Sequence, residues 1–186
     1  MSIHIKNPRS TYMHVPKTGG ESVSEWLRPT AGHAWKGNQK HATFQQMKSS
    51  YGNLGFTWAV VRNPWDRLVS GYHYYHRKNA RILRKKNNPI RDFEHFLQTE
   101  NWGKTLMIPQ WKFAPPQTDL VLRFETMHED FKQIQDFYKK QQGLPHKNRS
   151  HHKHYSEYYT EQWMIDVVEK HYGEDIKRFD YEFTYK

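Results

Sequence analysis

An α/β fold built around a parallel sheet is predicted by three features of this sequence. Short apolar runs alternate with segments of helical periodicity, each run is followed by a polar turn, and aromatic residues make up 16% of the chain. The 186 residues suffice for one domain with a well-packed core and are few for two. We therefore expect a single domain over residues 1–186, with a central parallel sheet flanked by helices.

The first half of the chain predicts two strands and three helices. STYMHV, residues 10–15, reads as a strand that PKTGG ends, and ESVSEWL, residues 21–27, then has helical spacing. A short helix is expected over residues 42–51. FTWAVV, residues 56–61, is continuous, aromatic and β-branched, which is typical of a fully buried strand. The helix expected over residues 65–78 has a proline near its first turn.

The second half predicts one more strand and three more helices. DFEHFLQ begins at Asp92, a favoured helix-capping residue. TDLVLRFE, residues 118–125, reads as the third strand, and residues 128–141 follow it as a helix. A last helix is expected over residues 160–172, with Trp163, Val167 and His171 on one face.

The composition favours an anionic partner and excludes cysteine chemistry. The formal charge is +10, which suits a nucleic acid, an acidic polysaccharide or a phosphorylated small molecule, although a solvated basic surface with no dedicated partner would give the same charge. Cysteine is absent, so disulfides, thiolate metal sites and a cysteine nucleophile are excluded. No stretch resembles a signal peptide or a membrane span, so we expect a soluble, cytoplasmic protein.

Candidate anion-binding residues follow the first strand. Two glycines, Gly19 and Gly20, would let the backbone approach an anion, and the N-terminus of the next helix supplies N–H groups and a positive dipole end. Lys17 adds a charge, while Thr18 and Ser22 add hydroxyl donors. The loop lacks the Gly-Lys-Ser/Thr order of a nucleotide triphosphatase loop. An ordinary glycine turn with a solvated lysine remains the alternative.

A second pair of candidates follows the buried strand. Arg62 stands where FTWAVV ends, and Ser70 lies two turns into the following helix. An arginine fork and a nearby hydroxyl suit a terminal phosphate. Ligands of such sheets bind at the carboxyl ends of the strands, so both strand ends are expected to serve one site.

Five stretches of this sequence, in order, resemble one enzyme family. They are HVPKTGG, KHATFQQM, VRNPWDRLVSGYHYY, DLVLRFETMHEDF and HYSEYYTEQWMIDVVEKHYGEDIKRFDYEF. Together they are similar to the carbohydrate sulfotransferases, in the branch of the heparan 2-O- and chondroitin sulfotransferases. The resemblance implies a single α/β domain with a nucleotide-kinase-like fold of the phosphate-loop type. It also implies 3′-phosphoadenosine-5′-phosphosulfate (PAPS) as the sulfuryl donor and no metal.

The resemblance also assigns roles to residues. Lys17 would contact the oxygen that bridges phosphate and sulfate. Donors around the 5′-phosphosulfate would come from Thr18, Gly19, Gly20, Glu21 and Ser22. Arg62 and Ser70 would hold the 3′-phosphate, and the segment Asn148, Arg149 and Ser150 would lie near the nucleotide.

A general base must take the proton of the attacking hydroxyl, and a histidine suits this task near neutral pH. His41 in KHAT resembles the catalytic histidine of the family, with Glu21 and His33 as the reserve candidates. Glu21 departs from the small or hydroxyl residue that is common at this point of the family's motif. The clustered histidines of HHKH, residues 151–154, favour a basic contact loop over a metal site.

The expected acceptor is a hydroxyl, most simply that of a saccharide, which the basic charge allows to be anionic. With no membrane anchor in view, a compact cytoplasmic relative of bacterial or viral type fits better than a Golgi enzyme. Two other readings stay open: a non-enzymatic binder of nucleic acid or another polyanion on a kinase-like fold, and a small-molecule phosphotransferase. The first conflicts with basic residues placed at strand ends, and the second with the missing triphosphatase loop.

Overall fold

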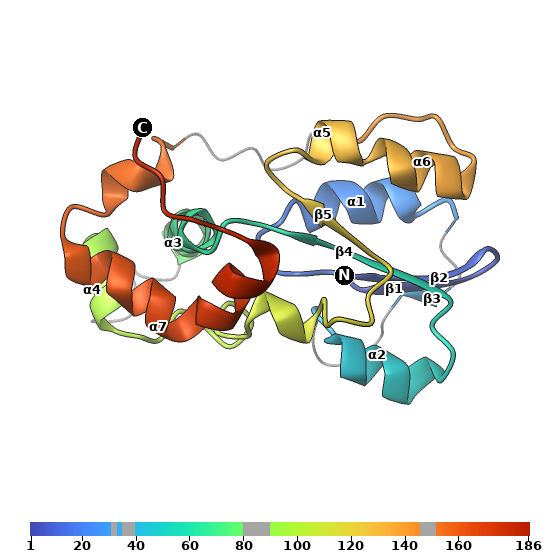
Figure 1. Ribbon diagram of the computed structural model, residues 1–186, viewed down its shortest axis with the longest axis horizontal. Helices are drawn as coiled ribbons and strands as arrows, with labels where there is room; N and C mark the ends of the chain where they lie inside the picture. Colours follow the sequence, from blue (N-terminus) through green and yellow to red (C-terminus); the bar gives the residue numbers. More distant parts are fainter. Residues whose placement is uncertain (31–32, 35–39, 80–89, 146–151) are drawn as a thin grey trace. The chain divides into compact units, whose positions relative to one another are not determined.

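The computed structural model describes residues 1–30, 33–34, 40–79, 90–145 and 152–186 (Figure 1). These residues form two compact units, each described by itself below. The first unit comprises Met1–Arg62 and Gln110–Arg149, and the second comprises Asn63–Pro109 and Ser150–Lys186. The fold is of the α/β class, as the sequence predicts. In the described ranges, no helix is both long and apolar enough to cross a membrane.

The first unit contains a sheet with strand order β3-β1-β2-β4-β5. Its strands are β1 (Ile3–Lys6), β2 (Arg9–Met13), β3 (His33–Ala34), β4 (Phe56–Val61) and β5 (Leu120–Arg123). β2, β4 and β5 run parallel and correspond to the three predicted strands. β1 pairs antiparallel with both β2 and β3, which the sequence analysis did not foresee. The sheet is therefore mixed, with a parallel part that leads to the candidate site.

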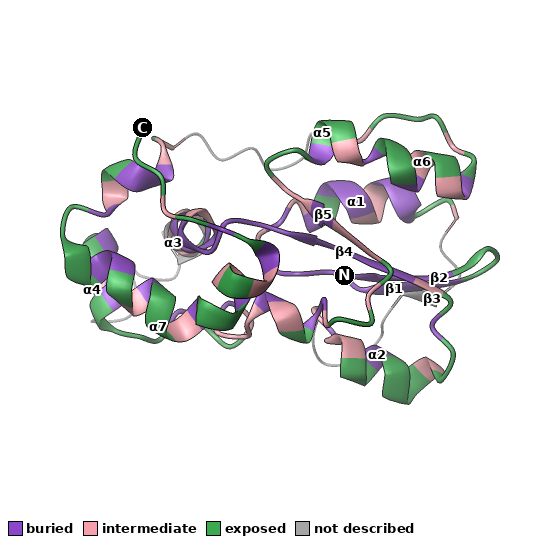
Figure 2. Cartoon of the chain, viewed as in Figure 1, coloured by how far each residue is buried: buried purple, intermediate pink, exposed green. Residues whose placement is uncertain are grey.

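Helices cover both faces of this sheet (Figure 1). α1 (Gly20–Leu27), α5 (Met127–Asp130) and α6 (Lys132–Tyr138) lie on one face, and α2 (Phe44–Tyr51) lies on the other. β2 and β4 are buried along most of their length, whereas α2 exposes much of its surface (Figure 2). The larger core joins the sheet to α1, α5 and α6 through Tyr12, Trp26, Trp58, Phe131 and Ile134.

Side chains fix the ends of the elements in this unit. Thr43 and Gln46 form a reciprocal capping box at the start of α2, and the capping residue Thr43 lies two residues beyond His41. Asp119 accepts hydrogen bonds from the backbone N–H and the hydroxyl of Thr57, at 2.8 and 2.7 Å, and so fixes β5 beside β4. The helix predicted over residues 128–141 is divided into α5 and α6 at Phe131, which caps both.

The second unit is helical and aromatic. It contains α3 (Pro64–Asn79), α4 (Phe93–Gln98), the 3₁₀ turn η3 (Tyr155–Tyr158) and α7 (Gln162–Phe179). Asn63 caps α3 by accepting from the N–H groups of Trp65 and Asp66, and Asp92 caps α4 as predicted. Rings interlock at the centre of the unit, where Phe93 and Phe183 both meet Tyr159 edge-on.

The face that Trp163, Val167 and His171 share is not the buried face of α7. Trp163 of α7 is 38% exposed, and the buried residues of the helix include Met164, Ile165, Val168 and Tyr172. The buried stripe is thus shifted by about one residue from the predicted one. The shift has a physical reason, since the stripe that starts at Met164 offers aliphatic side chains and a tyrosine to the core, whereas the other ends in His171, which pairs with Glu100 at 2.8 Å.

Candidate active site

The carboxyl ends of β2 and β4 bring two predicted residues together. Because these strands are parallel, the loop after β2 and Arg62 after β4 emerge at the same edge of the sheet. The Arg62 guanidinium donates a hydrogen bond from Nη1 to the carbonyl oxygen of Lys17, at 3.1 Å. The Arg62 side chain therefore contacts the backbone of the loop that carries Lys17, within the first unit.

The loop between β2 and α1 has an unusual backbone. Lys17 and Gly19 both have left-handed conformations, with φ of 72° and 74°. α1 begins at Gly20, and the N–H groups of Ser22 and Val23 turn back to the carbonyl oxygen of Gly19. A left-handed lysine is uncommon, and such backbone strain is concentrated at binding and catalytic sites.

Thr18, which follows Lys17, is fully buried, and its hydroxyl donates to the carbonyl oxygen of Val15 at 3.0 Å. The contribution of Thr18 to an anion would therefore have to come from its backbone N–H group.

Packing within the chain explains both glycines of the loop. A Cβ atom at Gly20 would lie 1.9 Å from Nε2 of His14, so the imidazole of His14 occupies the space of a side chain there. A Cβ atom at Gly19 would approach Met127 and Phe124 to 3.1 Å, in addition to the strained φ. Close contacts with other residues of the chain therefore account for both glycines without a bound ligand.

Arg62 is held in place from three sides. The side-chain amide of Gln110 accepts from the Arg62 N–H at 2.9 Å and donates to its carbonyl oxygen at 2.8 Å. The guanidinium lies over the ring of Phe124, 4.3 Å from its centre, and only 6% of Arg62 is exposed. A preorganised arginine of this kind loses little conformational entropy when it binds an anion.

His41 lies beside the loop through its contacts with His14. Its Nδ1 is 3.0 Å from the carbonyl oxygen of His14, and the two rings are 4.4 Å apart. A carbonyl oxygen can only accept, so Nδ1 carries the proton in this bond. In the neutral ring the lone pair then resides on Nε2, the nitrogen that can take up a proton.

His14 itself is a buried, neutral histidine. It is 5% exposed, and burial holds the pKa of its imidazole well below the ordinary value, with the positive charges around it, including Lys40 and Lys17, acting in the same direction. Its Nδ1 makes no hydrogen bond to the described residues. A neutral ring at this position adds no charge to the candidate anion-binding loop.

The remaining predicted residues are placed less centrally. Glu21 is exposed and lies 3.9 Å from the ammonium group of Lys40, whereas Ser22 is buried in α1. Ser70 is buried in α3, within the second unit, so its pairing with Arg62 stays a prediction. Asn148, Arg149 and Ser150 lie outside the described residues, as does the side chain of the reserve base His33.

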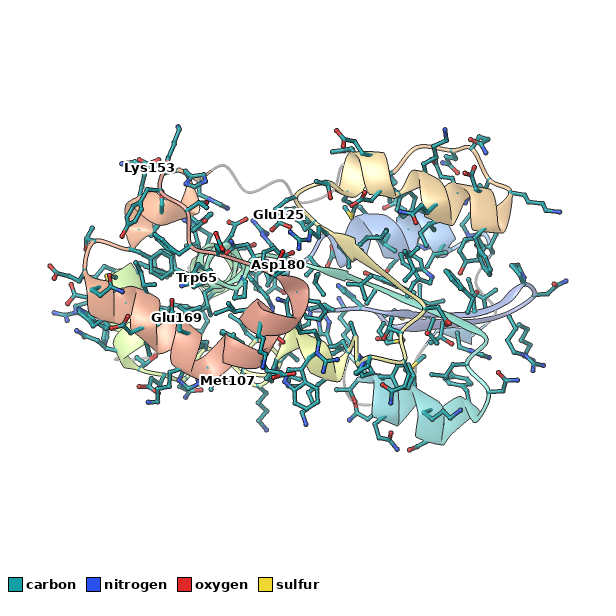
Figure 3. All side chains as sticks on the ribbon, viewed as in Figure 1. Trp65, Met107, Glu125, Lys153, Glu169 and Asp180 are labelled. Atoms are coloured by element: carbon teal, nitrogen blue, oxygen red, sulfur yellow. The ribbon has the colours of Figure 1, made fainter. Side chains whose placement is uncertain are left out.

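The second unit has a histidine and tyrosine cluster of its own. Nε2 of His73 is 2.7 Å from the hydroxyl of Tyr158, and the His73 ring stacks on His152 at 5.1 Å. A cavity of about 670 Å³ is lined by His152, Lys153, Glu157 and Tyr158, and Lys153 extends into solvent (Figure 3). His154 caps η3. Within the described part of the chain, no group of three or more potential ligands could hold a metal ion.

Two residues of the site were missed by the sequence analysis. Gln110 fixes the backbone of Arg62 from 48 residues away, and Ser2 contacts His14 and both neighbours of His41. Neither lies in a stretch with a recognisable motif. His14 carried a signal, since it opens the HVPKTGG stretch, but nothing in the sequence indicated that its ring fills the space above Gly20.

A lysine and an arginine at parallel strand ends, beside a glycine turn that opens a helix, define an α/β protein of the phosphate-loop type. The model of the sulfotransferase family matches residues 6–182. Because this match spans nearly the whole chain, the chain belongs to the sulfotransferase family, and its general activity is sulfuryl transfer. Searches of curated proteins and of solved structures found no match.

Proposed function

We propose that this protein transfers the sulfuryl group of PAPS to a hydroxyl of a saccharide, with His41 as the general base. The observation that carries the proposal is the arrangement of the first unit: Arg62 reaches the backbone of Lys17, and His41 bonds to the backbone of His14, three residues before Lys17. The cation that would stabilise the leaving group and the base that would activate the acceptor are therefore attached to one loop.

The residues of the loop fit a sulfated nucleotide by their chemistry. When bound, PAPS supplies an activated sulfuryl group on a phosphate leaving group. Lys17 and the N–H groups at the start of α1 would hold the phosphosulfate end and stabilise the charge that grows on the bridging oxygen. Arg62, with Ser70 as its predicted partner, would hold the 3′-phosphate, and the segment 148–150 would lie near the nucleotide.

His41 would take the proton of the acceptor hydroxyl on Nε2. The bond from Nδ1 to the His14 carbonyl oxygen supports this role, since it orients the ring and assigns the lone pair to Nε2. Glu21 is a weaker candidate because it is exposed and paired with Lys40. The formal charge of +10 supports an anionic saccharide as the acceptor.

A radiolabel experiment tests the proposal. The purified protein is incubated with PAPS labelled in the sulfate and with a pool of neutral and acidic saccharides, and sulfated products are separated from the donor. We expect labelled saccharide from PAPS and no labelled product from ATP carrying ³²P in its γ-phosphate. Label from ATP, or none from PAPS with any saccharide, would contradict the proposed donor and acceptor.

Two histidine variants test the base. His41→Ala should leave the binding of the desulfated product, PAP, intact and lower the transfer rate by about 10²–10⁴-fold. His128→Ala is the matched control, because His128 is an exposed histidine of α5 in the same unit. Equal transfer rates in the two variants would remove His41 from the mechanism.

A further inference from the structure

Ser2 connects β1 and β2 to the chain on both sides of His41. It is fully buried, and its hydroxyl accepts from the N–H of His14 at 3.0 Å and donates to the carbonyl oxygen of Ala42 at 3.1 Å. The N–H of Ser2 donates to the carbonyl oxygen of Lys40 at 3.2 Å. One small residue thus satisfies backbone groups of three other residues.

These hydrogen bonds hold the chain on both sides of His41, the candidate base. Lys40 and Ala42 are the immediate neighbours of His41, and both are tied to Ser2, while His41 itself is bonded to the carbonyl oxygen of His14. Ser2 also accepts from the N–H of His14. It is therefore hydrogen-bonded to the residue that accepts the His41 bond and to both chain neighbours of the residue that donates it. Ser2 is thus connected to the His41 ring through the backbones of only three residues, His14, Lys40 and Ala42.

We propose that Ser2 is a positioning residue that keeps His41 in its Nδ1–H form, with Nε2 presented as the base. The proposal rests on the function proposed for His41 and deepens it. Without the Ser2 hydroxyl, the His14 N–H and the Ala42 carbonyl group each lose a buried partner, and such groups are costly to leave unsatisfied. The segment 40–42 would then shift, and the bond that selects the tautomer would lengthen or break.

Ser10 offers a matched control. It is another fully buried serine of the same sheet, and its hydroxyl bonds to the carbonyl oxygen of Pro8 and to the hydroxyl of Tyr138. Ser10→Ala removes a buried hydroxyl as Ser2→Ala does, but it leaves all contacts of His41 in place. Ser2→Cys serves as a second variant that keeps the size of the side chain and weakens its hydrogen bonds.

Long-range ¹H–¹⁵N NMR of the histidine rings measures the tautomer directly and needs no acceptor. We expect the Nδ1–H form for His41 in the wild type and in Ser10→Ala, and a mixture with the Nε2–H form in Ser2→Ala, with Ser2→Cys between them. An Nε2–H form in the wild type would overturn the proposal. So would a tautomer that is unchanged in Ser2→Ala and Ser2→Cys.

A double-mutant cycle tests whether Ser2 acts through His41. Ser2→Ala should lower the transfer rate at saturating donor by about 10–100-fold, since small misplacements of a catalytic group cost factors of this size. It should lower the rate of His41→Ala no further. An equal effect in both backgrounds would overturn the inference alone, whereas a normal rate in His41→Ala would overturn the proposed base and the role of Ser2 together.

Discussion

At the scale of single residues, Lys17 combines a strained backbone with a charge that we propose to act in catalysis. Lys17→Gly relieves the left-handed conformation, so its free energy of unfolding should equal that of the wild type or exceed it by up to about 1 kcal/mol. Lys17→Gly and Lys17→Ala should both lower kcat more than they weaken PAPS binding, because the lysine acts where charge appears in the transition state. Urea unfolding and initial rates measure the two effects.

Lys139 is the control for this prediction. It has the same left-handed conformation, φ 52°, at the end of α6 in the same unit. Lys139→Gly should match Lys17→Gly in stability and leave kcat unchanged. An unchanged kcat in Lys17→Ala at saturating donor would show that the loop binds without assisting the transfer.

Arg62 donates a hydrogen bond to the backbone of the loop and is predicted to contact the ligand as well. Arg62→Ala should reduce the preference for PAP over a nucleotide without the 3′-phosphate by about 10–150-fold, the equivalent of one charge-assisted hydrogen bond of about 1.5–3 kcal/mol. Calorimetric titration of both nucleotides measures this ratio. An equal loss of affinity for both would mean that Arg62 only braces the Lys17 carbonyl group.

His14 gives the stability of the first unit a pH dependence of known sign. Its pKa is lowered in the folded chain, so below about pH 6.5 the unfolded chain takes up a proton that the folded chain does not. The stability that the neutral His14 ring contributes is fully present above the pKa of this residue in the unfolded chain and declines as the pH falls below it. Relative to His14→Gln, the wild type should lose up to about 1.3 kcal/mol of unfolding free energy between pH 7.5 and 5.5.

Urea unfolding at the two pH values, followed by tryptophan fluorescence, gives this difference. If the wild type and His14→Gln lose the same free energy on acidification, His14 is not the buried neutral group that its environment indicates.

At the scale of elements, the turn from β2 into α1 depends on the fit of His14 over Gly20. Gly20→Ala would place a methyl group on the imidazole, which overpacks the turn and should cost about 1–3 kcal/mol of stability together with PAP affinity. Gly143→Ala, in the same unit with no atom of the described residues within 4 Å of the added methyl group, should be neutral or slightly stabilising. Thermal unfolding of both variants compares them, and equal melting temperatures would contradict the fit.

A helix or strand could be predicted from the sequence when the residues that determine it lie within that element. β4 coincides with the predicted strand at residues 56–61 because a continuous apolar, β-branched run is buried on both faces. β1 was missed because its four residues form a strand through their pairing with β2 and β3, which flank it in the sheet. The buried face of α7 could not be read from spacing, because Met164, Val168 and Tyr172 have the same spacing of four residues as the face that starts at Trp163.

At the scale of the whole molecule, the candidate site also contains residues that local sequence predicts and residues that come together only in the folded chain. The proximity of Arg62 to the Lys17 backbone could be predicted because parallel strand ends meet at one edge of a sheet. Ser2 and Gln110 could not, because they act through backbone groups that are close only after folding. The side chains named by motif are those that we propose to carry the chemistry, and Ser2 and Gln110, which lie in no motif, hold the backbone beside them.

We propose above that the site binds a nucleotide with a 3′-phosphate and a sulfated 5′-phosphate. The most direct measurement compares the dissociation constants of PAP and ADP by calorimetry on the wild-type protein at one ionic strength. We expect PAP to bind at least about ten times more tightly than ADP, a ratio that corresponds to the lower end of the free energy of one charge-assisted contact. Equal affinities, or a preference for ADP, would contradict it and favour a phosphotransferase.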